Sequence, residues 1–76
     1  MRRKFKIEIF VYRSNIKSKK IAKIILLKLA EKFPKIESSF DLEDKDKIYR
    51  LEATQEQKKE IETFLNDNNV EIIELY

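Results

Sequence analysis

Residues 5–12 alternate between two sets of side chains, the period-two pattern of a strand with one buried face. The set that we expect to face the core consists of Phe5, Ile7, Ile9 and Val11. The set that we expect on the opposite, open face consists of Lys6, Glu8, Phe10 and Tyr12. The first predicted element is therefore a strand whose aromatic residues lie away from the core.

Apolar residues then recur at helical spacing, which predicts a helix that packs on the core through one face. Its expected core residues are Ile21, Ala22, Ile25, Leu29 and Phe33. Ser18 precedes them and can cap the helix by accepting a hydrogen bond from its first turn. Pro34 cannot extend the helix and disfavours helical geometry at the residue before it, so we expect the helix to end there.

Two further strands are predicted at residues 36–43 and 47–53, joined by a turn at residues 44–46. The side chains expected to point inward are Phe40, Leu42, Tyr49, Leu51 and Ala53. Those expected on the open face of the later strand are Ile48, Arg50 and Glu52. Four carboxylates gather near the turn, and a solvated hairpin explains them better than a cation site, because alternate strand residues point to opposite faces.

A second helix follows, since Thr54 and Gln57 have the spacing of a capping box. Its apolar stripe consists of Ile61, Phe64 and Leu65. Asn68 and Asn69 are expected to close it, because asparagine tolerates the left-handed conformation at a helix end. Residues 70–76 are rich in Ile, Leu and Val and predict a last strand.

This order of elements, with short connections and right-handed crossovers, predicts an α+β fold, the ferredoxin-like βαββαβ plait. Its four-stranded antiparallel sheet would have the strand order 4-1-3-2, with both helices on one face. The 76 residues are expected to form one domain, residues 1–76, because 42% apolar content suffices for a small core.

The composition removes several classes of chemistry. The chain contains no Cys, His or Gly, so thiolate metal sites, cysteine nucleophiles and imidazole bases are excluded. Acylphosphatase-like catalysis on this fold would need a glycine-containing phosphate loop, which is missing. We therefore expect a non-enzymatic protein with no catalytic residues, no metal site and no cofactor.

The hydrophobic segments are short. The longest apolar run covers residues 24–27, whereas about 20 residues are needed to cross a bilayer. Residues 1–4 are charged, but the alternation that follows them is not the apolar stretch of an export signal. A soluble, cytoplasmic protein without a membrane partner is expected.

Charge is distributed unevenly along the chain, although its formal net charge is only +3. Residues 1–35 contain 12 Lys or Arg and 2 acids, whereas residues 36–76 contain 5 Lys or Arg and 12 acids. One interpretation is that the two halves interleave in the fold and neutralise each other. The other is a basic face that binds an acidic protein, a phosphate group or nucleic acid.

Two segments carry a resemblance to a known family. Residues 40–43 (FDLE) and 47–52 (KIYRLE) are similar to the hairpin of heavy-metal-associated domains, and the chain from Val11 to Tyr76 resembles these metallochaperone-type plaits. In that family the first strand leads into a GMxCxxC loop. Aligning this loop places Ile16 at the Met position, Ser18 at the first Cys and Ile21 at the second, so both thiolates are absent. The resemblance therefore implies a relative without the soft-metal chemistry, since Cu(I) and Zn(II) need thiolate or imidazole ligands.

The same resemblance implies where a partner would bind. In heavy-metal-associated domains the corresponding loop and helix face dock a partner protein, and the matching residues here are Lys17, Lys19, Lys20 and Lys23. Lysines in the first turns of a helix also oppose its macrodipole. We therefore expect a small binding or adaptor domain, a monomer or weak homodimer, that contacts another protein through this face, where an acidic protein would complement the lysines.

An alternative expectation is a plait that binds nucleic acid through its open sheet face and basic N-terminus. Aromatic side chains on such a face stack bases in RNA-recognition plaits. The residues that would serve this function are Arg2, Arg3, Lys4, Lys6, Phe10, Tyr12 and Arg13.

Overall fold

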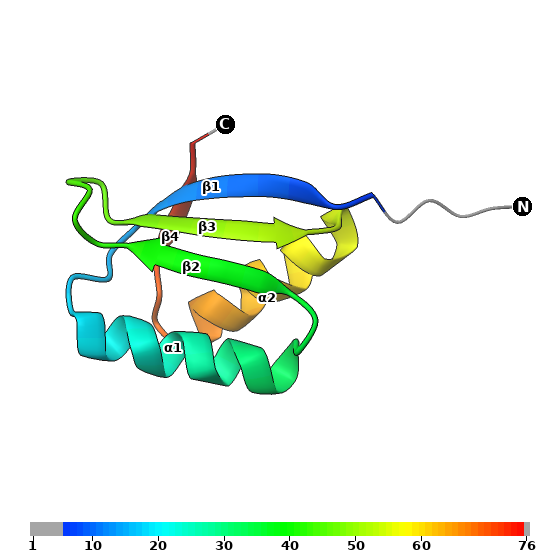
Figure 1. The fold of residues 1–76 in the computed structure, drawn as a ribbon, viewed down its shortest axis with the longest axis horizontal. Coiled ribbons are helices and arrows are strands. Elements are labelled where there is room, and N and C mark those ends of the chain that lie inside the picture. The colour runs from blue at the N-terminus through cyan, green and yellow to red at the C-terminus, as the bar shows by residue number, and fades with distance from the viewer. Residues whose placement is uncertain (1–5, 76) are drawn as a thin grey trace, which may run out of the picture.

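The computed structural model describes residues 6–75. Four strands and two helices follow one another in the predicted order (Figure 1). Their bounds are β1 Glu8–Ser14, α1 Lys19–Lys32, β2 Glu37–Asp41, β3 Ile48–Ala53, α2 Gln55–Asp67 and β4 Ile72–Glu74. The strands β2 and β4 are shorter than the predicted ranges 36–43 and 70–76.

The strands form one antiparallel sheet with the order β2-β3-β1-β4, which is the predicted order 4-1-3-2 counted from the other edge. Both helices cover the same face of this sheet (Figure 1). The ferredoxin-like plait is thereby confirmed. Among the described residues, no helix is long and apolar enough to cross a membrane.

Local sequence signals explain the helix boundaries. The Ser18 hydroxyl accepts a hydrogen bond from the Ile21 amide at 3.3 Å, and α1 ends at Lys32, with Phe33 as its C-cap just before Pro34. The Thr54 hydroxyl accepts from the Gln57 amide while the Gln57 side chain accepts from the Thr54 amide, so the predicted capping box is present. After α2, Asn69 has a φ of 63°, the left-handed conformation that asparagine tolerates at a helix end.

The core lies between the sheet and the helices, and it corrects the prediction for β1. Phe10 and Tyr12 are 6% and 1% exposed and face the helices, whereas Ile9 is 60% exposed on the open face. The register explains this orientation, because Tyr12 lies opposite Tyr49 and shares its inward face. Tyr12 and Tyr49 pack with ring centroids 5.9 Å apart. The assignment of Ile7, Ile9 and Val11 to the core and of Phe10 and Tyr12 to the open face was therefore wrong. Phe5, which was assigned to the core with them, lies outside the described residues.

The other inward-facing predictions hold for β3 and for the half-buried side chains near β2. Tyr49, Leu51 and Ala53 are fully buried, and Phe40 and Leu42 pack against the core. The open face carries the other side chains of the strands. From β1 and β4 these include Ile9, Val11 and Ile73, and from β3 they are Ile48, Arg50 and Glu52. The open face thus combines apolar side chains with charged ones.

Candidate functional site

The loop between β1 and α1 is held by hydrogen bonds to two other segments. The Ser14 hydroxyl donates to the Lys47 carbonyl at 2.7 Å and accepts from the Ile16 amide at 3.2 Å. The Asn15 side chain accepts from the Glu71 amide at 3.0 Å, just before β4. The start of α1 therefore has a fixed position relative to the sheet.

The lysines that the sequence singled out lie together at this end of α1. Lys17, Lys19, Lys20 and Lys23 are all exposed, and the first turn of α1 contains no acidic residue. Among residues 6–75, ion pairs join Arg13 to Asp46 and Lys58 to Glu62 and Glu74. The α1 lysines take no part in these pairs, so the acidic half of the chain does not neutralise them by direct contact.

Helix α1 also exposes large apolar side chains. Ile21, Ile24 and Leu27 are 48%, 44% and 61% exposed. The core face of α1 consists of Ala22, Ile25 and Leu29, with Phe33 half-buried. Ile21 was predicted to be a core residue and was placed wrongly, because α1 is apolar on more than one side and the sequence period alone did not fix its inner face.

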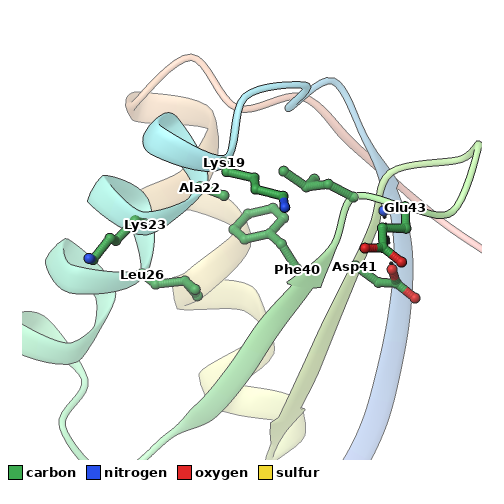
Figure 2. Close-up of a pocket in the computed structure, with 8 residues that line it drawn as sticks. Lys19, Ala22, Lys23, Leu26, Phe40, Asp41 and Glu43 are labelled. Atoms are coloured by element: carbon green, nitrogen blue, oxygen red, sulfur yellow. Dashed lines mark hydrogen bonds between the residues drawn. The ribbon is translucent and has the colours of Figure 1, made fainter.

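A cavity lies beside this helix, between α1 and the end of β2 (Figure 2). Its volume is about 320 Å³. The residues that line it are Lys19, Ala22, Lys23, Leu26, Phe40, Asp41, Leu42 and Glu43. Figure 2 shows Lys19 extending from α1 toward the Phe40 ring, while the carboxylates of Asp41 and Glu43 point away from the helix. The cavity therefore combines apolar side chains with lysines on its helix side, and no sequence motif predicts it.

The three positions aligned with the family's metal loop do not form a metal site. Ile16 is buried in the core, Ser18 caps α1, and Ile21 is exposed. The chain has no His or Cys, so Asp and Glu are the remaining ligands of this kind. In the described part of the chain, no group of three or more of these carboxylates is placed to hold a metal ion.

The acidic residues near the β2–β3 turn instead stabilise the turn itself. The Asp44 carboxylate accepts from the Asp46 amide at 2.8 Å, and the Asp41 carboxylate accepts from the Glu43 amide at 3.2 Å. Asp46 also pairs with Arg13 at 3.4 Å. These contacts agree with the expectation of a solvated hairpin.

The residues of the alternative nucleic-acid surface do not come together. Phe10 and Tyr12 are buried under the helices and present no ring face on the open sheet for a base. Arg13 is exposed and paired with Asp46, and Lys6 is exposed ahead of β1. Arg2, Arg3 and Lys4 lie outside the described residues.

A polar cluster between α2 and the sheet was missed by the sequence analysis. The Tyr12 hydroxyl donates to Glu62 Oε2 at 2.8 Å, and Lys58 Nζ lies 2.8 Å from Glu74 Oε1. Lys58 Nζ also lies 5.1 Å from the centre of the Phe10 ring, within the range of a cation–π contact. These contacts tie α2 to β1 and β4.

The surroundings of this cluster change two pKa values. Burial raises the pKa of Tyr12 well above its usual range, and the hydrogen bond to Glu62 raises it further. The hydrogen bond with Glu74 raises the pKa of Lys58. Tyr12 is therefore neutral and Lys58 charged at neutral pH, as expected for groups that hold a fold together.

A second buried phenol differs from Tyr12 because it has no partner. The Tyr49 hydroxyl forms no hydrogen bond with any described residue. Burial raises the pKa of Tyr49 to about 12, and the nearby Ser38 hydroxyl opposes this shift although its geometry falls short of a hydrogen bond. Tyr49 packs against Phe40 with ring centroids 4.8 Å apart, so its contribution is to the core.

In comparisons with known proteins, no family model matches the chain, and neither a curated protein nor a solved structure shows significant similarity to it.

Proposed function

We propose that this chain is a non-enzymatic binding domain that contacts another protein through the β1–α1 loop and the exposed face of α1. The observation that carries the proposal is the composition of that face. One helix presents exposed lysines at its start and exposed Ile21, Ile24 and Leu27 along its length. The lysines form no ion pair among the described residues. Large exposed apolar residues beside such charges are typical of a surface that a partner covers.

Local stability does not account for this arrangement. Each cation in the first turn of a helix interacts unfavourably with the macrodipole, which lowers the stability by about 0.3–1 kcal/mol for an exposed group. Ile21, Ile24 and Leu27 leave about half of their surface exposed, so much of their apolar area adds nothing to the core. A local cost without a local gain favours a functional explanation.

The resemblance to heavy-metal-associated domains supports the same face, because in that family the corresponding loop and helix dock a partner protein. This support is independent of metal binding, since Ser18 and Ile21 supply no thiolate. The partner that best complements the lysines is acidic. The nucleic-acid alternative is not proposed further, because its aromatic residues Phe10 and Tyr12 are buried.

Charge reversal tests the proposal. The double variant Lys19→Glu/Lys20→Glu is expected to be at least as stable as the parent, because acids in the first turn interact favourably with the helix dipole. The same variant should lose its partner, since reversed charges slow association and add repulsion. Thermal unfolding measures the stability, and affinity capture from the source organism with quantitative mass spectrometry measures partner binding.

Lys59→Glu is the matched control, because Lys59 is an exposed lysine on α2 outside the proposed face. It should retain every protein that the parent captures. Unchanged capture by the double variant would contradict the proposal. So would capture that disappears when the lysate is treated with nuclease, because the partner would then be nucleic acid.

A further inference from the structure

Two cavities lie beside β2, between that strand and α1. The cavity at the end of β2, described above, adjoins a second cavity of about 290 Å³, and Leu26 contributes to both. The second cavity is lined by Leu26, Leu29, Ala30, Ile36, Glu37 and Ser38. We call these two adjoining cavities the channel, and apolar side chains of α1 and of residues 36–42 contribute to the lining of both.

One stripe of α1 forms the helix wall of this channel. Lys19, Lys23, Leu26 and Ala30 are spaced i, i+4, i+7 and i+11, so they lie on one side of the helix. The stripe is basic where it faces the end of β2 and apolar where it faces the start. Neither lysine forms an ion pair with a carboxylate of the strand among the described residues.

The other wall of the channel is a free strand edge. Within residues 6–75, strand β2 is the outermost strand of the sheet and pairs with β3 alone. The Val11 carbonyl accepts from the Leu75 amide on the β4 side of β1, so Arg50, opposite Val11, directs its backbone groups toward β2. Its partner Ser39 then bonds to β3, and the backbone groups of Ser38 and Phe40 face the free edge.

We propose that this channel binds an extended acidic peptide segment of the partner protein, which adds a strand to β2. The inference rests on the proposed function and names the kind of chain that occupies part of the same surface. A strand added to a sheet edge gains main-chain hydrogen bonds, and its alternate side chains enter neighbouring pockets. Three features that favour such binding are present here: a free strand edge, apolar pockets, and lysines that favour an acidic ligand.

The spacing of the pockets defines the ligand further. One pocket lies against Ile36 and Ser38 and the other against Phe40 and Leu42, so their centres are four strand residues apart, or roughly 13 Å. Side chains at positions i and i+4 of the added strand would therefore fill them. Acidic residues are expected within two positions of the anchor near Lys19 and Lys23.

A second copy of this chain fits the channel less well than a foreign peptide. If two copies joined through their β2 edges, the two α1 stripes would face each other. Each stripe carries Lys19 and Lys23 and no acidic residue, so this pairing would bring like charges together. An acidic segment instead complements both lysines.

The test is selection of peptides from a phage-displayed library of random twelve-residue sequences, with the full chain as bait. Enriched sequences should carry net negative charge and apolar residues four positions apart. A synthetic peptide of the leading sequence is then titrated by fluorescence anisotropy. Lys23→Glu should weaken binding at least tenfold, and so should Ala30→Trp, which fills the second pocket at an exposed position. Lys59→Glu should leave the affinity unchanged.

Methylation of single amide nitrogens in the synthetic peptide tests strand addition itself. Affinity should fall at every second position, because alternate amides of an added strand face β2. The inference would be overturned if the selection enriched no peptides or enriched basic ones, or if methylation had the same effect at every position. It would also be overturned if the free chain formed a dimer that dissociates with Lys23→Glu. If Lys19→Glu/Lys20→Glu abolishes partner capture while Lys23→Glu and Ala30→Trp both leave it intact, the proposed function stands and the peptide channel falls.

Discussion

Phe10→Ala is expected to destabilise the domain by about 3–5 kcal/mol, the usual cost of removing a buried phenylalanine. Phe10 is 6% exposed and packs under the helices, with Lys58 over its ring. A domain of this size has a total stability of roughly 4–11 kcal/mol, so this substitution removes a large share of it. Chemical denaturation monitored by circular dichroism measures the change.

Ile9→Ala is the matched control on the neighbouring residue of the same strand. Ile9 is 60% exposed on the open face, so its truncation should cost less than about 1 kcal/mol. The pair of variants reports directly on which face of β1 is buried. Equal costs, or a larger cost for Ile9→Ala, would show that the aliphatic set of β1 faces the core and would contradict the structure.

The second large effect is a loss of stability in alkali. The pKa of Tyr49 is about 12 in the folded chain, compared with about 10 for an exposed tyrosine. The folded state thus holds this proton more tightly than the unfolded state does. Its contribution is complete below pH 10 and declines as the pH rises through 12, by roughly 2–3 kcal/mol in total. Tyr12, whose pKa is also raised by burial, acts in the same direction.

Tyr49→Phe separates this contribution from the general effect of deprotonating lysines. The variant lacks the phenol, so its free energy of unfolding should fall less between pH 10 and pH 12 than that of the parent. At pH 7 it should be at least as stable as the parent, because the Tyr49 hydroxyl has no hydrogen-bond partner among the described residues and an unsatisfied buried hydroxyl costs about 1–3 kcal/mol. Urea titrations at several pH values provide both results. Identical pH slopes for the two proteins would refute the assignment.

Local signals in the sequence were sufficient to predict the order of the elements. Ser18, Pro34 and the Thr54–Gln57 pair act within one or two turns of the chain, and each marks a boundary in the structure as expected. The arrangement of the strands followed because short connections leave few topologies open.

The face of β1 was not predictable by alternation alone. Residues 9–12 are apolar on both sides of the strand, so the period does not decide which side is buried. Tertiary pairing decides it: Tyr12 lies opposite Tyr49 and donates to Glu62, and aromatic rings bury more area than aliphatic side chains do. The partner residues of Tyr12 are 37 and 50 positions away in the chain, beyond any local pattern.

The candidate site was predictable only in part. The lysines of α1 were visible as a local conflict with the helix dipole, and the structure leaves them without ion pairs in the described residues. The channel beside them depends on how α1 packs against β2, which brings Leu26 near Phe40 across the fold. No motif in the sequence indicates that these two residues lie close together.

Photo-cross-linking in cells of the source organism tests the central claim, that α1 and its surroundings contact a protein partner. The residue p-benzoylphenylalanine replaces Lys23 on α1 in one variant and Arg50 on the open sheet face in the other, both of which are exposed. We predict a discrete protein adduct from position 23 and none from position 50. An adduct from position 50 alone, or an adduct at position 23 that nuclease digests, would contradict the account.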